Sequence, residues 1–480
     1  MLCSAATYAL PVSSPRKPPQ IPEPILELGR RFVDAGYELA LVGGPVRDEL
    51  LGRTSGDWDL TTNAHPEQTL ALLEGWADVV WDIGIRFGTV GGQRHGLKVE
   101  ITTYRTEQYA DDTRKPEVQY GTSLEDDLFR RDFTVNAMAV RLPSGELVDP
   151  FGGLADVQEG VLRTPGTPEM SFSDDPLRMM RAARFASQLG FRVVPDVVIA
   201  MTEMAERLDI VSAERIQVEL SKLVLGAHPR EGLTLLVETG LADRFLPELG
   251  KLRLEIDEHH HHKDVYEHSL TVLEQAIELE RTHEPVCAPD LALRLAALLH
   301  DIGKPKTRRF EQGGGVSFHH HEVVGAKLVR KRLSELRYSN EIIDDVSKLV
   351  ELHLRFHGYG SGDWTDSAVR RYVRDAGDQL VRLHKLTRAD STTRNKRKAF
   401  MLQATYDELE RHISVLAEQE ELNSIRPDLD GNAIMGILGI GPGPAIGQAY
   451  KFLLELRMEQ GPLAPEQAEV ALRAWWAQRA

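Results

Sequence analysis

Cysteine is scarce in this sequence: only Cys3 and Cys287 occur among 480 residues. Two cysteines cannot form a disulfide framework or a cysteine-based zinc site, and such sparing use is typical of a reducing compartment. Long apolar runs are also missing, since even the stretch from Leu291 to Leu299 contains Arg294. The first 20 residues are rich in serine and proline and lack an apolar signal core. We therefore expect a soluble cytoplasmic protein with no membrane partner, in which residues 1–20 are a disordered extension.

Positive charge is in deficit as well. The chain has 57 Lys and Arg against 73 Asp and Glu, which gives a formal net charge of −16. This balance argues against nucleic-acid binding by the whole surface, but it leaves room for a local basic track. The length predicts roughly three or four domains, each large enough to bury a core.

The stretch from Leu39 to Glu49 has the pattern of a strand, a glycine turn and a helix. Leu39 to Val42 is a short apolar run, Gly43 and Gly44 interrupt it, and Pro45 suits the start of a helix. Backbone N–H groups at bare glycines can approach a triphosphate closely. The sequence therefore predicts a phosphate-binding turn here.

Two acids follow at the start of a second strand, in Asp57-Trp58-Asp59-Leu60. Side chains alternate across a strand, so Asp57 and Asp59 share a face with their Cα atoms roughly 7 Å apart. Two carboxylates held in this way suit Mg²⁺, which prefers oxygen ligands and keeps positions open for phosphates. An isolated pair of this kind is more often a solvated strand end, and it is the nearby glycine turn that favours the metal site.

A third acid could come from the strand predicted at Leu97 to Thr103. There Lys98, Glu100 and Thr102 share one face, so Glu100 either joins the two aspartates or is simply an exposed strand residue. The polar stretch from Thr106 to Glu125 is predicted as a long loop.

The segment from Arg130 to Ala137 places polar side chains beside apolar ones. Arg130 and Arg131 are natural partners for phosphates. The alternative is a helix start in which Asp132 or Thr134 caps the first turn. The segment from Asp149 to Asp156 indicates only a turn and a cap.

Beyond Gly160 the strand signals fade and the chain is predicted to be helical almost to its end. A helix opens near Asp174-Asp175-Pro176 and stops at Gly190, with Asp175 as a candidate N-cap. Arg178 continues into a basic ridge with Arg181 and Arg184. Side by side, Asp175 and Arg178 could accept a hydrogen bond from an exocyclic amino group and donate one to a ring atom, which suits cytosine and adenine.

Several histidines and acids stand on successive predicted helices further along. A single histidine on an apolar helix face is usually a core residue, but this group includes an adjacent His-Asp pair and is typical of a divalent-metal site. The members are His268, His300, Asp301, His321, His353 and Asp390.

The region around residue 390 also has a local basic excess. Six basic residues stand against the single acid Asp390: Lys385, Arg388, Arg394, Lys396, Arg397 and Lys398. They form a candidate phosphate track for RNA or a solvated helix surface. The histidine run from His259 to His262 is interpreted as a native, partly exposed linker. A turn at 441–444 precedes an amphipathic helix near Ile446 to Met458.

Taken together, the motifs resemble the class II CCA-adding tRNA nucleotidyltransferases of the polymerase-β-like superfamily. The match runs in family order through the segments Gly43–Asp48, Asp57–Asp59, Arg130–Ala137, Asp149–Asp156, Asp174–Arg178 and Glu214–Arg215. Asp174 stands where many relatives have glutamate. The resemblance implies an α+β fold, with a small mixed-sheet head over residues 21–160, a helical neck over 161–255, an HD body over 256–420 and a tail over 421–480.

The resemblance also implies roles for individual residues. Asp57 and Asp59 would hold Mg²⁺ for catalysis. Other residues would border the triphosphate or contact the nucleotide: Gly43, Gly44, Arg47, Arg131, Asp132 and Asn136. Asp175 and Arg178 would select CTP first and ATP last, helped by the stretch from Arg105 to Tyr120, and the tail would reach the tRNA body.

The downstream histidines and acids resemble the HD phosphohydrolase superfamily. That resemblance implies His268, His300, Asp301 and Asp390 as metal ligands, with His321 and His353 available to a second ion of unknown identity. The expected activity is addition of CCA to tRNA 3′ ends from CTP and ATP.

Two kinds of rival activity remain. One is a relative that adds only CC, only A or poly(A), although residues 61–73 lack the basic signature usual in poly(A) polymerases. The other is an HD phosphohydrolase with an RNA-binding head.

Overall fold

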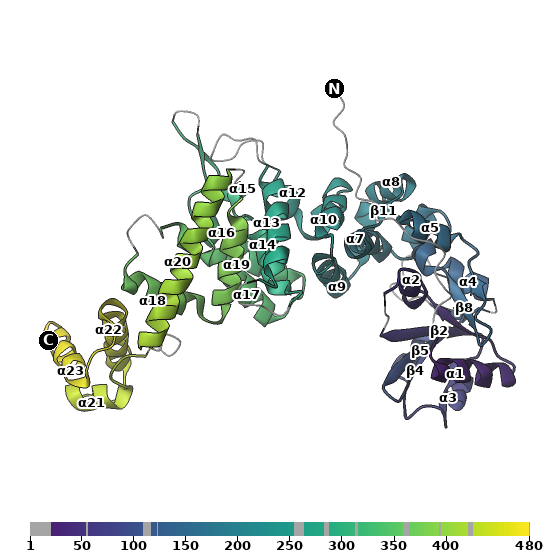
Figure 1. Ribbon diagram of the computed structural model, residues 1–480, viewed down its shortest axis with the longest axis horizontal. Coiled ribbons are helices and arrows are strands. Elements are labelled where there is room, and N and C mark those ends of the chain that lie inside the picture. Colours follow the sequence, from purple (N-terminus) through teal and green to yellow (C-terminus); the bar gives the residue numbers. More distant parts are fainter. Residues whose placement is uncertain are drawn as a thin grey trace. The chain divides into compact units, whose positions relative to one another are not determined.

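The computed structural model describes residues 21–53, 56–108, 117–121, 123–253, 264–282, 288–312, 315–358, 364–392, 395–420 and 426–479. The chain forms two compact units, Met1–Phe245 and Leu246–Ala480, shown in Figure 1. The first combines a mixed sheet with helices and the second is almost entirely helical. The α+β prediction is therefore confirmed, whereas the finer domain boundaries remain predictions.

A seven-stranded sheet forms the centre of the head. Its order is β3 (Val79–Trp81), β4 (Thr89–Arg94), β5 (Leu97–Thr103), β2 (Asp57–Thr62), β1 (Leu39–Val42), β8 (Ala139–Leu142) and β9 (Leu147–Val148). Only β2 and β5 pair in parallel, while the other neighbours are antiparallel. The strands predicted at Leu39–Val42 and Leu97–Thr103 are confirmed at those bounds.

Four helices accompany this sheet: α1 (Glu23–Asp34), α2 (Gly44–Leu50), α3 (Pro66–Leu73) and α4 (Leu124–Phe129). Helix α1 buries Ile25, Leu28 and Phe32, which recur at helical spacing. The loop predicted over 106–125 is partly wrong. Strand β6 (Arg105–Gln108) pairs with β7 (Glu117–Tyr120), because a backbone ladder satisfies N–H and C=O groups whatever the polarity of the side chains.

Helices follow the head within the first unit: α5 (Gly153–Glu159), α6 (Pro168–Asp174), α7 (Leu177–Leu189), α8 (Pro195–Glu203), α9 (Ala213–Val224), α10 (Pro229–Glu238) and α11 (Leu241–Phe245). A short parallel ladder joins β10 (Val161–Leu162) to β11 (Arg192–Val193). Helix α7 ends at Gly190 with φ 71°, as the sequence predicts. It packs against α9 and α10, which places its ridge of arginines beside neighbouring elements.

The second unit consists of α12 (Pro247–Gly250), α13 (Val265–Leu279), α14 (Leu291–Leu299), α15 (Lys304–Thr307), α16 (His321–Glu335), α17 (Asn340–Leu352), α18 (Asp366–Ala376), α19 (Leu380–Asp390), α20 (Lys396–Glu420), α21 (Gly431–Leu438), α22 (Pro444–Gln460) and α23 (Pro465–Ala477). A two-stranded ladder joins β12 (Arg309–Phe310) to β13 (Val316–Ser317). Helices α13, α14, α17 and α19 pack together, and the last three helices share their own apolar cluster. Among the described residues, no helix has both the length and the apolar character needed to cross a membrane.

Candidate active sites

The first site lies where β2 and β5 run side by side. Their register pairs Asp57 with Lys98 and Asp59 with Glu100. Because alternate residues of a strand share a face, positions 57, 59 and 100 lie on one face of the sheet. Asp59 and Glu100 are exposed to solvent on this face. The structure does not describe the side chain of Asp57. Neighbouring exposed carboxylates are a suitable oxygen donor set for a divalent cation.

The glycine turn directly follows β1, and β1 pairs with the strand that carries Asp57 and Asp59. Gly43 precedes helix α2 with φ 74° and ψ −133°, a conformation that is open essentially only to glycine. A Cβ atom at Gly43 would lie 2.9 Å from Nη1 of Arg131. The turn therefore brings the guanidinium of Arg131 directly against bare backbone.

A buried polar chain connects this turn to helix α7. Arg47 Nη1 donates to Asn136 Oδ1 at 2.5 Å, and Asn136 Nδ2 donates to Asp132 Oδ1 at 2.9 Å. Arg181 Nε then donates to Asp132 Oδ2 at 2.7 Å. Burial raises the pKa of Asp132, but the charge of Arg181 and hydrogen bonds from Asn136, Arg181 and the Phe133 backbone outweigh it and lower the pKa to about 2. Asp132 is therefore an anion that orders three segments.

A second buried acid, Asp127, holds the two adjacent arginines. Arg130 Nη2 lies 2.8 Å from Asp127 Oδ1, and Arg131 Nη2 lies 3.2 Å from Asp127 Oδ2. Burial raises the pKa of Asp127, but these two cations outweigh burial and leave it below its ordinary value. Thr61 Oγ1 also donates to Asp127, at 3.3 Å, which ties the pair to β2. Sequence reasoning missed Asp127, although its spacing of three and four residues from the arginines is a signal.

Helices α2 and α7 place three arginines around one aromatic ring. The guanidinium carbons of Arg184, Arg47 and Arg181 lie 3.9, 5.1 and 5.5 Å from the centroid of the Phe185 ring. Glu219 of α9 is buried between two of these arginines, with Oε2 2.6 Å from Arg184 Nε. Sequence reasoning found the arginines but not Phe185 or Glu219, because their roles depend on the packing of α7 against α9.

Asp175 and Arg178 are both held by the protein itself. Asp175 Oδ1 accepts from the Leu177 N–H at 3.1 Å, consistent with the predicted cap, and its Oδ2 accepts from Arg215 at 2.9 Å. Arg178 is buried and donates to the hydroxyl of Ser171 at 3.0 Å and to the carbonyl of Arg130. Each of the two side chains is thus oriented by contacts from a second element.

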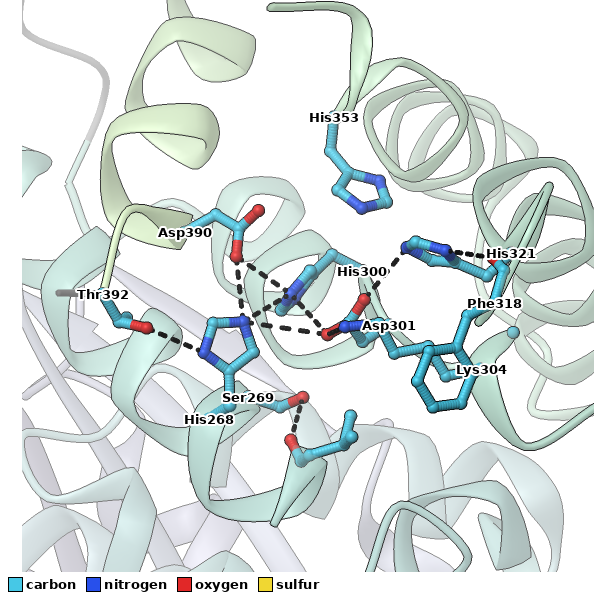
Figure 2. Close-up of polar contacts among 12 residues, drawn as sticks. His268, Ser269, His300, Asp301, Lys304, Phe318, His321, His353, Asp390 and Thr392 are labelled. Carbon is cyan, nitrogen blue, oxygen red and sulfur yellow. Dashed lines mark hydrogen bonds and ion pairs between the residues drawn. The ribbon is translucent and has the colours of Figure 1, made fainter. Parts of the chain in front are cut away.

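The second site consists of two neighbouring groups of ligands in the helical unit. One group combines His268, His300 and Asp390, and the other combines Asp301, His321 and His353. Figure 2 shows the six side chains converging from separate helices and the turns that follow them. His268 Nε2 lies 2.9 Å from Asp390 Oδ1, and His321 Nε2 lies 3.2 Å from Asp301 Oδ1.

Hydrogen bonds from the backbone set the orientation of three of the imidazoles. The Nδ1 atoms of His300, His321 and His353 lie 2.9, 2.8 and 2.7 Å from the carbonyl oxygens three residues before them. A proton on each Nδ1 leaves the lone pair on Nε2 for a metal. Within the described part of the chain, the buried Nε2 of His353 has no hydrogen-bond partner. The donor set therefore fits a divalent cation, as the sequence predicts, without fixing its identity.

The charges of this centre agree with a cation-binding role. Burial lowers the pKa of His353 to about 3, so its imidazole is neutral. Burial also lowers the pKa of His300, but Asp301 and Asp390 outweigh it and raise the pKa to about 10. A buried carboxylate, Asp301, and a half-buried one, Asp390, in one centre demand compensating positive charge, which a bound metal would supply.

The predicted basic track is only partly available. Arg388 is 3% exposed and donates to Gln403, Asp407 and Glu410, and the Nζ of the buried Lys385 donates to backbone carbonyls. Because these groups are occupied inside the protein, we remove both from the track. Arg397 and Lys398 are exposed. Arg394, the side chain of Lys396 and the run His259–His262 lie outside the described part.

Comparisons with known proteins agree with this organisation. Residues 39–163 match the poly A polymerase head domain, residues 190–252 match the probable RNA and SrmB-binding site of polymerase A, and residues 265–395 match the HD domain. An A-adding tRNA nucleotidyltransferase from Deinococcus radiodurans is 34% identical over 454 residues, covering 91% of this chain and 95% of that protein.

CCA-adding enzymes are also similar to this chain. The one from Levilactobacillus brevis is 44% identical over 224 residues, which cover 46% of this chain and 55% of that enzyme. The crystal structure of the Bacillus stearothermophilus CCA-adding enzyme in complex with CTP superimposes with a TM-score of 0.66 at 25% identity, over 96% of this chain and 99% of that one. The predicted resemblance is confirmed, and the chain belongs to the tRNA nucleotidyltransferases that combine a poly(A) polymerase head domain with an HD domain.

Proposed function

We propose that this enzyme adds CCA to the 3′ end of tRNA, using CTP and ATP and releasing pyrophosphate. The observation that carries the proposal is the register of β2 and β5, which sets Asp59 beside Glu100 on the face that also includes position 57. The glycine turn at Gly43 follows the neighbouring strand. The similarity to a CCA-adding enzyme solved with CTP supports the same substrate class.

In the proposed reaction the 3′-oxygen of the tRNA forms a bond to the α-phosphorus of the nucleotide. The bond from that phosphorus to the oxygen bridging to the β-phosphate breaks, pyrophosphate leaves, and the 3′-hydroxyl proton passes to solvent. Asp57, Asp59 and Glu100 would hold Mg²⁺, which supplies charge neutralisation when bound. The backbone at Gly43 and Gly44 would border the triphosphate.

The buried polar chain would orient the incoming nucleotide. Arg47, Asn136 and Asp132 are fixed to one another, and Arg131 lies against the glycine turn. Since these groups are ordered by the fold, little conformational entropy is lost when a nucleotide binds. Arg181 and Arg184 would add positive potential from helix α7.

Base selection is proposed for Asp175 and Arg178. The carboxylate would accept from the exocyclic amino group of cytosine or adenine, and the guanidinium would donate to a ring atom. Guanine and uracil present a carbonyl oxygen where the carboxylate needs a donor, so they would be rejected. The β6–β7 segment is the proposed aid in changing from C to A addition.

Isosteric variants of the acids test the proposal. Asp59→Asn and Asp57→Asn keep the shape of the side chain but remove the charge that would hold Mg²⁺, so nucleotide addition should fall by at least about a hundredfold. Asp34→Asn, at the exposed end of α1, is the matched control. Full activity in both active-site variants would refute these roles.

A-addition alone is the second candidate. One relative that matches along nearly the whole chain is an A-adding tRNA nucleotidyltransferase. Supplying CTP as the only nucleotide separates the two candidates, because an A-adding enzyme cannot extend tRNA under that condition.

We also propose that the HD centre is a phosphohydrolase site that holds divalent metal. Its support is the pair of ligand groups and Lys304, whose Nζ lies 2.8 Å from Asp301 Oδ2 and could meet a phosphate. His300→Ala with Asp301→Ala should remove metal-dependent phosphate release and leave nucleotide addition within about twofold of the parent. Loss of both activities at once would contradict two separate sites.

We propose a cytoplasmic location for the protein, since two cysteines in 480 residues fit a reducing compartment.

A further inference from the structure

A hollow of about 210 Å³ lies in the first unit, beside the residues assigned to nucleotide binding. The end of α4, the loop before α6, helix α6 and the start of α7 enclose it. Its wall includes Phe129, Gly166, Met170, Arg130, Arg131 and Arg178. In this wall, Arg131 and Arg178 are also proposed to contact the incoming nucleotide.

Two large apolar side chains in the wall are exposed to solvent. Phe129 is 42% exposed and Met170 is 50% exposed, although both types are normally buried. Phe129 is supported from one side by Phe151, with ring centroids 5.6 Å apart. A supported but open aromatic side chain is suited to stack against a flat ligand.

Gly166 keeps this space open. A Cβ atom at this position would lie 2.9 Å from Cζ of Phe129 and 3.5 Å from Cε of Met170. Its backbone does not have a φ angle in the range reserved for glycine, so alanine is excluded only by the side chains around it. The absence of a side chain at Gly166 therefore leaves room between Phe129 and Met170.

The remaining wall is polar and rich in charged side chains. Three arginines and two aspartates line it, and two of the arginines also pair with Asp127. A flat apolar surface bordered by cations, donors and acceptors matches a nucleobase attached to a phosphodiester chain.

The position of the hollow indicates which base it takes. Arg131 contacts the glycine turn, and Arg178 is one half of the pair proposed to read the incoming base. The 3′-oxygen must reach the α-phosphorus of the incoming nucleotide, so the terminal base of the RNA lies close to the incoming base, and a hollow that shares Arg178 with the base-reading pair is close enough to hold it. We propose that the hollow binds the base of the 3′-terminal nucleotide of the RNA. This inference rests on the proposed nucleotidyl transfer.

A fluorescent base at the RNA 3′ end tests the inference by binding alone. The probe is a tRNA acceptor minihelix whose last nucleotide is 2-aminopurine, mixed with the full-length enzyme without CTP or ATP. Stacking on Phe129 should quench the fluorescence at saturating enzyme. Phe129→Ala should abolish the quench by removing the ring, and Gly166→Ala should do so by filling the space. Gly447→Ala, in an exposed turn of α22 with open space around it, is the control.

Steady-state kinetics add a second readout. Loss of one stacking contact should raise the KM for the minihelix about tenfold and leave the KM for CTP and ATP within about twofold. Quenching that persists in both variants, with circular dichroism showing that they are folded, would overturn the inference. A raised KM for nucleotides alone would also overturn it and assign the hollow to the incoming base. Quenching by a parent enzyme that adds no nucleotide would instead refute the proposed transfer.

Discussion

Gly43 carries two separate constraints at a single residue: a backbone conformation essentially restricted to glycine and a guanidinium 2.9 Å from where a Cβ would be. Gly43→Ala should therefore displace Arg131 and raise the KM for CTP and ATP by about tenfold or more. The control Gly36→Ala also has a positive φ, of 84°, but nothing lies within 4 Å of its Cβ position. Equal KM values in the two variants would mean that the close contact between Gly43 and the Arg131 guanidinium does not affect nucleotide binding.

Asp132 gives a prediction about pH and stability. Its pKa of about 2 in the folded protein is below the ordinary value of 3.8, so the folded state binds fewer protons than the unfolded state in this range. The resulting stabilisation of about 2 kcal/mol is fully present above about pH 4 and is lost as the pH falls through about 2.

Asp132→Asn removes this contribution, so the difference in unfolding free energy between parent and variant should be constant from pH 5 to 7 and shrink below pH 4. Urea unfolding followed by circular dichroism measures it. A difference that grows as the pH falls would contradict the ion pair with Arg181.

Some of these residues could be predicted from sequence and others could not. Asp57 and Asp59 were expected to share a face because strands alternate with a period of two, which spacing alone reveals. The place of Glu100 stayed open in the sequence because it depends on how β2 and β5 pair. Glu219 is invisible to such reasoning, since it meets Arg184 only when α9 packs on α7. Arg388 looked like part of an RNA track because charge can be read from sequence, whereas burial against Asp407 and Glu410 cannot.

Among the helices, α7 carries Phe185, whose ring packs against three guanidinium groups. This ring is 4% exposed, touches three arginines and meets Phe133 edge-on at 5.8 Å. Phe185→Leu should let those cations relax and raise the KM for nucleotides by about tenfold, with a smaller change in kcat.

The matched control for this change is Phe172→Leu, which alters a fully buried ring on α6. Both variants should lose stability, because each leaves space in a core, but only Phe185→Leu should change the KM. Phe185→Tyr should restore the parent value. Identical kinetics in the two leucine variants would reduce Phe185 to a packing role.

Helices and strands were predicted correctly where the spacing of apolar residues agreed with the positions of glycine and proline. The strand Leu97–Thr103 alternates, and the helix that ends at Gly190 has a glycine in the left-handed conformation. It failed at 106–125, where polar side chains suggested a loop although the backbone of β6 and β7 pairs in register. Cross-strand pairing depends on a partner distant in sequence, so local polarity is a poor guide to it.

At the scale of the whole molecule, the acidic chain needs local positive charge to hold tRNA. Arg397 and Lys398 lie exposed at the start of α20 and are proposed as phosphate contacts. Their double alanine variant should lower the salt dependence of tRNA binding by about 1.5 in the slope of log Kd against log salt concentration. The control is the double alanine variant of Arg330 and Lys331, an exposed pair on α16. Equal slopes in the two variants would exclude this track.

The residues proposed for nucleotidyl transfer lie in the first unit, and the two ligand groups of the HD centre lie in the second. CCA addition is tested by following tRNA extension with each nucleotide. The purified enzyme is incubated with Mg²⁺ and tRNA lacking its 3′ CCA, with CTP alone, ATP alone or both, and product lengths are resolved on a sequencing gel. We predict two added residues with CTP alone and a third only when ATP is also present. Extension by ATP alone without any use of CTP, or no extension at all, would contradict CCA addition.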